Sequence, residues 1–191
     1  TRGCRLAMLY PEIPDMQARA IVRAALAVLD REGETVGVEI MIPLVALTQE
    51  LETQREIVVA AVEDELAKAG RELDYTVGTM IELPRAALVA DKIAEHADFF
   101  SFGTNDLTQT AIGISRDDAE TGFLREYLEK RILPDNPFAT IDEAGVGKLM
   151  TMAVEDGRAA RPNLEIGICG EHGGDPKTIA FCHRIGLDYV S

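Results

Sequence analysis

The sequence is short of cysteine, aromatic residues and basic residues, and it contains no tryptophan. Of its 191 residues, three are cysteine, 5% are aromatic and 19 are lysine or arginine, against 33 aspartates and glutamates. Three unevenly spaced cysteines cannot form a disulfide framework, and one must be unpaired, which indicates a reducing, cytosolic setting. The formal net charge of −14 argues against nucleic acid or an anionic membrane as a partner, because such a surface repels both.

Long hydrophobic runs are also missing. No apolar stretch approaches the ~20 residues that a membrane-spanning helix requires, and no signal peptide precedes the first predicted helix. We therefore expect a cytoplasmic protein that does not bind membranes. Internal repeats, low-complexity segments and domain linkers are absent too, and 47% hydrophobic residues are enough for one sizeable core. Residues 1–191 are predicted to form a single domain.

What the sequence does contain is a regular alternation of two patterns. Short runs rich in valine, isoleucine and phenylalanine predict buried strands, and longer amphipathic segments predict helices. The predicted strands are 36–44, 73–82, 99–103, 164–169 and the start of another at 187–191. The predicted helices are 15–31 (capped by Asp15), 48–69, 85–96, 107–114, 117–131, 140–158 and 176–184, whereas 3–9 is only a short apolar stretch.

Near-continuous apolar strands that alternate with helices are typical of parallel α/β proteins. About five strands can be recognised, whereas a complete (β/α)8 barrel of the TIM type occupies ~250 residues. The chain also starts at Thr1 without a methionine and stops inside a predicted strand. We therefore expect the last five strands of an incomplete (β/α)8 barrel, with open edges that favour dimerisation or aggregation.

Three of the predicted strands lead into polar loops. The strand 99–103 runs into Thr-Asn-Asp, the strand 73–82 stops at Glu82, and the strand 164–169 stops at Cys169 before Gly-Glu-His-Gly-Gly. Parallel α/β proteins bind ligands at the carboxyl ends of their strands. If the three strands share one sheet, two carboxylates and a thiol meet at the same edge, which predicts a functional site.

Each of these residues also has a purely structural interpretation. Glu82 suits the start of a helix, and Asn105 and Asp106 suit helix N-caps. Cys169 suits a buried core position, as most cysteines on apolar strands do. The occurrence of polar residues at three strand ends together favours a site over three unrelated structural roles.

Three long motifs, in this order, carry a resemblance to a known family. They are Gly-Thr-Met-Ile-Glu-Leu-Pro-Arg-Ala at 78–86, Ser-Phe-Gly-Thr-Asn-Asp-Leu-Thr-Gln at 101–109 and Gly-Ile-Cys-Gly-Glu-His-Gly-Gly at 167–174. Over essentially its whole length the chain resembles the phosphoenolpyruvate-utilising enzymes, and within them the dikinase branch. Phosphoenolpyruvate synthase and enzyme I of the phosphotransferase system share the shorter cores of these motifs, so they stay open as alternatives.

The resemblance implies a phosphotransferase domain that binds phosphoenolpyruvate or pyruvate together with Mg²⁺. It implies that Glu82 and Asp106 hold the metal through their hard carboxylate oxygens. Cys169 resembles the catalytic proton donor of the family, which passes a proton to and from the methyl carbon of pyruvate. The substrate-binding residues that the resemblance implies are Glu82, Gly103, Thr104, Asn105, Asp106 and Arg116.

The resemblance also implies partners that lie outside this chain. A phosphohistidine on another domain of the parent chain would exchange its phosphoryl group with enolpyruvate, a further domain would bind ATP, and the barrel would form a homodimer. The arginines that the family carries on earlier strands are missing, and neither Arg2 nor Arg5 is assigned their role. A non-catalytic dimerisation fragment and another Mg²⁺-enolpyruvate barrel, such as an aldolase or lyase, are further alternatives. Whether His172 touches substrate also stays open.

Overall fold

A five-stranded parallel sheet forms the centre of the computed structural model, which describes residues 2–191. The strands are β1 (Val38–Ile42), β2 (Tyr75–Ile81), β3 (Phe99–Gly103), β4 (Glu165–Cys169) and β5 (Tyr189–Val190). They are neighbours in the order β1-β2-β3-β4-β5, and every neighbouring pair is parallel.

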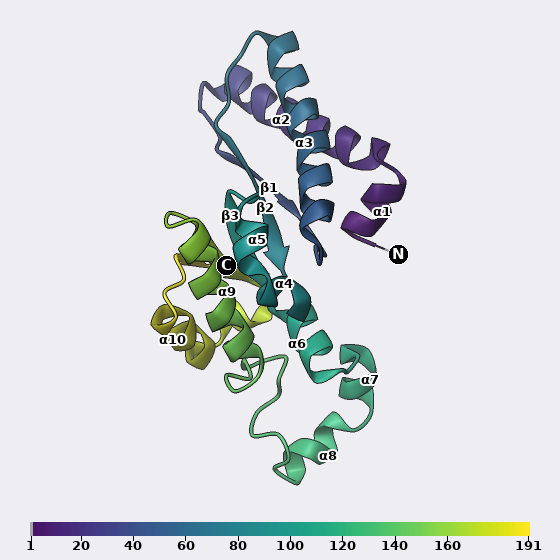
Figure 1. The fold of residues 1–191 in the computed structure, drawn as a ribbon, viewed down its shortest axis with the longest axis vertical. Coiled ribbons are helices and arrows are strands. Elements are labelled where there is room, and N and C mark those ends of the chain that lie inside the picture. The colour runs from purple at the N-terminus through teal and green to yellow at the C-terminus, as the bar shows by residue number, and fades with distance from the viewer. Residues whose placement is uncertain (1) are drawn as a thin grey trace.

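Helices connect these strands. They are α1 (Cys4–Leu9), α2 (Glu12–Glu32), α3 (Thr48–Ala69), α4 (Pro84–Leu88), α5 (Ala90–Ala94), α6 (Thr104–Ile112), α7 (Arg116–Thr121), α8 (Leu124–Glu129), α9 (Val146–Ala160) and α10 (Pro176–Arg184). A short 3-10 helix, η1 (Glu171–Gly174), follows β4. The molecule is elongated, with α2 and α3 at one end and α7 and α8 at the other (Figure 1). No helix within residues 2–191 is both long and apolar enough to cross a membrane.

The strand order distinguishes this sheet from a doubly wound one. A doubly wound sheet reverses its strand order at a switch point and carries helices on both faces. Here the order follows the sequence without a reversal. Right-handed crossovers that always step in the same direction place their helices on one side of the sheet, as in a barrel. The predicted α/β fold, with five parallel strands of a (β/α)8 barrel, is confirmed.

Most predicted elements agree with the structure to within a few residues, but several differ. Residues 3–9, predicted only as an apolar stretch, form α1. The predicted helix 85–96 is interrupted at Val89, whose φ of −127° and ψ of 31° are not helical, so it becomes α4 and α5. The predicted helix 117–131 is likewise divided into α7 and α8, and the helix predicted to begin at residue 140 begins at Val146.

The prediction that Asp15 caps the second helix is wrong. α2 begins three residues earlier, at Glu12, directly after Pro11. Proline suits the start of a helix because its fixed φ is helical and the N–H that it lacks would have no helical partner there. Asp15 therefore lies inside α2, where its carboxylate accepts hydrogen bonds from Arg19 one turn later, at 2.9 and 3.0 Å.

The core lies between the sheet and the helices that cover it. All five residues of β3 are buried, as expected for the central strand. α9 approaches this strand closely at Gly157, where a Cβ atom would lie 2.9 Å from the ring of Phe100. Because protein interiors are close-packed, this helix can lie so near the sheet only with glycine at that position.

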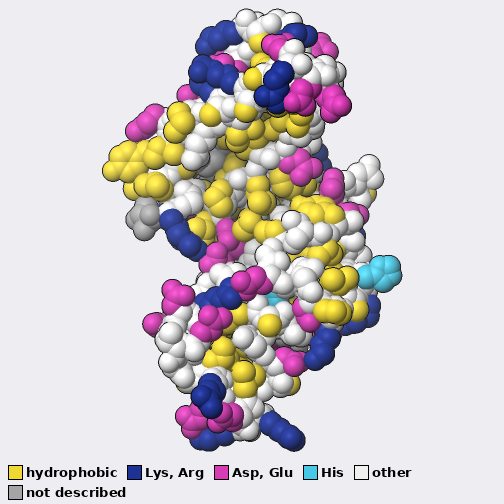
Figure 2. All heavy atoms as spheres, turned by 180° about the vertical axis from the view of Figure 1, so that it is seen from behind, with side chains coloured by type: hydrophobic (Ala, Val, Ile, Leu, Met, Phe, Trp, Pro, Cys, Tyr) yellow, Lys and Arg dark blue, Asp and Glu magenta, His cyan; other side chains and the backbone are white. Residues whose placement is uncertain are grey.

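β1 forms an open edge of the sheet, with a hydrophobic hollow beside it. Within residues 2–191 it has β2 as its only neighbouring strand. Mostly apolar side chains of α1, α2, α3 and β1 line a cavity of about 610 Å³. Leu9 and Met41 are 66% and 37% exposed, and Figure 2 shows hydrophobic side chains gathered over this half of the molecule. The open edge expected for an incomplete barrel is therefore present.

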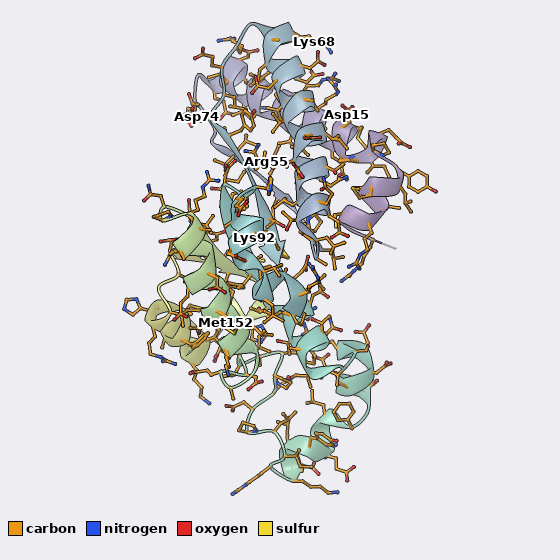
Figure 3. All side chains as sticks on the ribbon, viewed as in Figure 1. Asp15, Arg55, Lys68, Asp74, Lys92 and Met152 are labelled. Carbon is orange, nitrogen blue, oxygen red and sulfur yellow. The ribbon has the colours of Figure 1, made fainter. Side chains whose placement is uncertain are left out.

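Asp98, directly before β3, is hydrogen-bonded to β2, to α3 and to the residue that follows α9. It precedes β3, and its carboxylate accepts hydrogen bonds from the backbone N–H of Val77 (2.9 Å) and from Arg55 and Arg161 (both 3.0 Å). Arg55 projects from α3, where Figure 3 labels it. Burial alone would raise the pKa of Asp98, but the backbone N–H and the two arginines outweigh burial and lower it.

We expect Asp98→Ala to lower the free energy of unfolding by about 2–4 kcal/mol, because Arg55 and the N–H of Val77 lose this acceptor and Arg161 keeps only the carbonyl oxygen of Ala97. Urea denaturation at neutral pH measures this change. Asp91→Ala is the matched control: its side chain is 46% exposed, and we expect a change below about 0.5 kcal/mol. Equal losses in the two variants would contradict the role of Asp98.

Candidate active site

The carboxyl ends of β2, β3 and β4 bring the predicted site residues to one edge of the sheet. Glu82 directly follows β2, whose last residue, Ile81, is paired with Phe102 of β3. Gly103 at the end of β3 is paired with Cys169 at the end of β4. Glu82, Gly103 and Cys169 therefore lie next to one another on three neighbouring strands.

Glu82 is a buried carboxylate, only 3% exposed. Its Oε1 accepts a hydrogen bond of 2.6 Å from the backbone N–H of Leu44, in the loop after β1. Burial is the main reason why the pKa of Glu82 is raised to about 7, and the neighbouring carboxyl group of Asp106 raises it further. The N–H of Leu44 and the charge of Arg2 act in the opposite direction. A buried carboxyl group with a second carboxyl group beside it is a favourable place for a cation.

Asp106 lies in the first turn of α6, where the helix dipole favours a negative charge. Its Oδ1 accepts hydrogen bonds from Arg2 (2.9 Å) and from Gln109 (3.3 Å). Reasoning from the sequence left Arg2 without a role, although the structure brings it to the predicted site. A sequence feature that could have indicated a turn here is Gly3, directly after Arg2. Its φ is 59°, and α1 begins at the next residue.

Gly103, the last residue of β3, and Thr104, the first residue of α6, have different surroundings. A Cβ atom on Gly103 would lie 2.4 Å from the sulfur of Met80 and 2.8 Å from Cβ of Glu82, so packing across the strands requires glycine here. Thr104 is fully buried, and its hydroxyl is hydrogen-bonded to a ring nitrogen of His172. The Thr104 hydroxyl is therefore occupied inside the protein, and the residue does not line the cavity described below.

Arg116 is brought to the same edge from α7. Its guanidinium donates hydrogen bonds to the side chains of Asn105 (3.1 Å), Glu120 (3.0 Å) and Glu171 (2.5 Å), and it lies 5.3 Å from the centre of the Phe138 ring. One arginine thus connects the start of α6 with η1, which follows β4. Arg116 and Asn105, both among the residues that the resemblance implies bind substrate, are therefore in direct contact.

Cys169 differs from the other two cysteines in its surroundings. It is half-buried at the end of β4, with Sγ 3.6 Å from the carbonyl oxygen of Phe102. Cys4 and Cys182 are buried, and burial raises the pKa of each thiol to about 11. Cys169 is therefore the thiol best placed to exchange a proton with a molecule outside the protein.

Asn105 and Asp106 line a cavity of about 770 Å³ together with Arg2 and Arg116, whereas Glu82 and Cys169 are not among its lining residues. Within residues 2–191 no cluster of three or more histidine, cysteine, aspartate or glutamate side chains could hold a metal ion. The neighbouring carboxylates of Glu82 and Asp106 still fit Mg²⁺, which binds few protein oxygens and keeps positions for water and substrate. The cavity is lined by Arg2, Asn105, Asp106, Gln109, Thr110, Arg116, Asp117 and Glu120.

Comparison with known proteins places the chain among relatives that are much longer. A family model described as "PEP-utilising enzyme, PEP-binding domain" matches residues 1–191. Pyruvate, phosphate dikinase of Clostridium symbiosum is 54% identical over 190 residues, which cover 100% of this chain and 22% of that protein. The corresponding proteins of Rhizobium meliloti (strain 1021) and Arabidopsis thaliana (pyruvate, phosphate dikinase 1, chloroplastic) are both 56% identical, again over 100% of this chain, and 21% and 20% of their own length is covered. The chain thus spans about a fifth of the length of these relatives.

Among solved structures, the crystal structure of citrate synthase SbnG overlays with a TM-score of 0.49. The two chains are 18% identical, and the overlay covers 91% of this chain and 69% of that one. This likeness is too weak to say more about the fold or the site.

The raised pKa of Glu82 predicts how stability depends on pH. The folded protein holds this proton more tightly than the unfolded chain, so its stabilising effect is complete below the ordinary pKa of 4.5 and is lost as the pH rises through about 7. Glu82→Gln removes this dependence and keeps an acceptor for Leu44. Between about pH 5 and pH 8, we expect the wild type to lose roughly 2–3 kcal/mol more unfolding free energy than this variant.

Urea denaturation at a series of pH values, in metal-free buffer with a chelator, measures the difference. Glu155→Gln on the exposed face of α9 is the matched control and should follow the wild type. A Glu82→Gln curve parallel to the wild-type curve would show that Glu82 is not protonated in this range.

Proposed function

Because the chain belongs to the PEP-utilising enzyme family, as its phosphoenolpyruvate-binding domain, we propose that it is this domain of a pyruvate, phosphate dikinase. The reaction proposed for this domain is the transfer of a phosphoryl group between phosphoenolpyruvate and a histidine, which forms or consumes pyruvate. The observation that carries the proposal is that Glu82, Gly103 and Cys169 lie side by side at the ends of neighbouring strands. Asp106, which neighbours Glu82, lines a cavity together with Arg2 and Arg116. The identity of 54–56% to proteins named pyruvate, phosphate dikinase favours this member over phosphoenolpyruvate synthase or enzyme I.

Glu82 and Asp106 are the residues that would hold Mg²⁺ in this function. When bound, the metal would stabilise the negative charge that develops on the enolate oxygen. The protein positions Glu82 through the Leu44 N–H, which leaves its second carboxylate oxygen for the ion. Arg2, which now neutralises Asp106, would be free to move toward the substrate once a cation takes its place.

The substrate is a small anion with carboxylate and phosphate or enolate oxygens. The backbone N–H groups at the start of α6 and the side chain of Asn105 would donate hydrogen bonds to these oxygens, because the first N–H groups of a helix have no helical acceptor. Arg2 and Arg116 supply positive charge on the same cavity. Arginine suits this task because its planar guanidinium binds carboxylate and phosphate through two hydrogen bonds at once.

Cys169 is the proposed acid and base. When phosphoenolpyruvate loses its phosphoryl group, the bond between the enol oxygen and phosphorus breaks, and the Cys169 S–H gives its proton to the terminal carbon to form the methyl group of pyruvate. In the reverse direction the thiolate removes that proton. A thiol serves both directions because its ordinary pKa of ~8.5 lies near neutral pH.

The histidine that accepts the phosphoryl group must come from outside this domain. The sequence contains three histidines, and His172 alone lies in a loop of the candidate site. Both of its ring nitrogens are hydrogen-bonded inside the protein and cannot accept a phosphoryl group. We therefore assign the phosphohistidine, and the ATP chemistry that charges it, to other parts of a longer protein. Homodimerisation through this domain belongs to the same proposal.

Calorimetric titration with oxalate, a mimic of enolpyruvate, tests the binding part of the proposal. We expect the 191-residue chain to bind oxalate in the presence of Mg²⁺ and not in its absence. Asp106→Asn should weaken this binding by about a hundredfold, because it removes the charge that holds the ion. Asp117→Asn removes an equal charge from the lining of the same cavity and should leave the affinity within about twofold.

Two results would contradict this proposal. Oxalate binding that does not depend on Mg²⁺ would remove the metal from the site. Equal losses of oxalate affinity in Asp106→Asn and Asp117→Asn would show that Asp106 acts only through its negative charge near the cavity and does not bind the ion.

The role of Cys169 is tested by the exchange of pyruvate methyl protons with deuterated water. In a full-length dikinase that carries this domain, we expect Cys169→Ala to slow this exchange by about a hundredfold or more. Mg²⁺-dependent oxalate affinity should stay within about twofold, because the thiol is not a ligand of the ion. Cys182→Ala, which removes a thiol from α10, is the control and should keep its exchange rate. Full exchange in Cys169→Ala would exclude this residue as the proton donor.

A further inference from the structure

His172 is a buried side chain whose contacts join the loops of the candidate site. It lies in η1, three residues after Cys169, and is 1% exposed. Its Nδ1 is 2.8 Å from Oγ1 of Thr104, and its Nε2 is 2.9 Å from the carbonyl oxygen of Pro137. One imidazole in η1 thus contacts both the first residue of α6 and the segment between α8 and α9.

These two contacts determine which ring nitrogen carries the hydrogen. A carbonyl oxygen can only accept, so Nε2 of His172 must donate its hydrogen to Pro137. In the neutral ring Nδ1 is then the acceptor, and it takes the hydroxyl hydrogen of Thr104. Burial lowers the pKa of His172, which favours the neutral ring.

The backbone after β4 is shaped to allow this contact. Gly170, between Cys169 and η1, has a φ of 105°, a conformation that residues with a side chain rarely adopt. It brings the turn back over the loop after β3, so that a Cβ atom on Gly170 would lie 4.0 Å from Oγ1 of Thr104. Cys169 is paired with Gly103 in the sheet, and β4 ends at Cys169, so the residues after Cys169 leave the sheet.

We propose that His172 is a positioning residue for Cys169. Its hydrogen bond with Thr104 holds the turn after β4 against the start of α6, and this sets where the thiol lies relative to Asn105 and Asp106. The consequence for catalysis rests on the proposed function, in which Cys169 is the proton donor. The hydrogen bond between His172 and Thr104, and the position of the thiol that it sets, require neither ligand nor metal.

Variants of the two partners separate the hydrogen bonds. Thr104→Val keeps the shape of the side chain and removes the hydroxyl that donates to Nδ1. His172→Gln places an amide nitrogen near the position of Nε2, so it keeps a donor for Pro137 but no acceptor for Thr104. His172→Asn does the reverse, with its carbonyl oxygen near the position of Nδ1, and is the conservative variant that should restore the bond to Thr104.

The measurement is the rate at which iodoacetamide alkylates Cys169 at a fixed pH, followed by mass spectrometry. Cys4 and Cys182 are buried and serve as internal controls in every sample. We expect Thr104→Val and His172→Gln to change the Cys169 rate by about fivefold, the effect of one neutral hydrogen bond, and His172→Asn to stay within about twofold. In the wild type, ¹⁵N spectra of the imidazole should show hydrogen on Nε2 and not on Nδ1.

Rates within about twofold of the wild type in both Thr104→Val and His172→Gln would overturn the proposal, as would a wild-type ring with hydrogen on Nδ1. A variant in which Cys4 and Cys182 also react has unfolded, and the wild-type imidazole spectrum then decides the question. Because no oxalate or Mg²⁺ is present, failure of this test and failure of the proposed function are distinguishable.

Discussion

The burial of the Glu82 carboxylate beside Asp106 is the constraint on which the candidate site depends. A buried carboxylate is costly unless hydrogen bonds or opposite charges compensate it. Here the backbone N–H of Leu44 satisfies one oxygen at 2.6 Å, and Leu44 has a φ of 60° in order to do so. This left-handed conformation costs of order 1 kcal/mol or more for a residue with a Cβ atom. The conformation of Leu44, in the loop after β1, is thus linked to Glu82, the residue that follows β2.

The same constraint accounts for glycines from distant parts of the chain. A Cβ atom on Gly103 would strike Met80 and Glu82, and one on Gly3 would lie 2.7 Å from Cβ of Leu44. The missing side chains at Gly103 and Gly3 leave room for the Glu82 carboxylate and for Leu44, whose N–H donates to it. The start of α1 consequently belongs to the site: Gly3 packs on Leu44, and Arg2 reaches Asp106.

The charge of the site differs from the charge of the whole chain. With 33 acidic and 19 basic residues, the protein as a whole repels small anions. The cavity beside α6 nevertheless carries Arg2 and Arg116, each paired with a carboxylate, Asp106 and Glu171 respectively. In the proposed function, such local pairing would let an acidic protein bind an anionic substrate and keep both arginines paired when the substrate is absent.

The sequence alone determined the α/β class, the five strands and the polar residues at three strand ends. It could do so because hydrophobic periodicity, turn residues and contiguous motifs act over a few neighbouring positions. Only the tertiary structure decided that Arg2 meets Asp106, 104 residues away, and that the Thr104 hydroxyl belongs to His172. Even the interruption at Val89 is invisible to periodicity. Such pairings depend on how loops and helices pack against the finished sheet, and no local pattern records that packing.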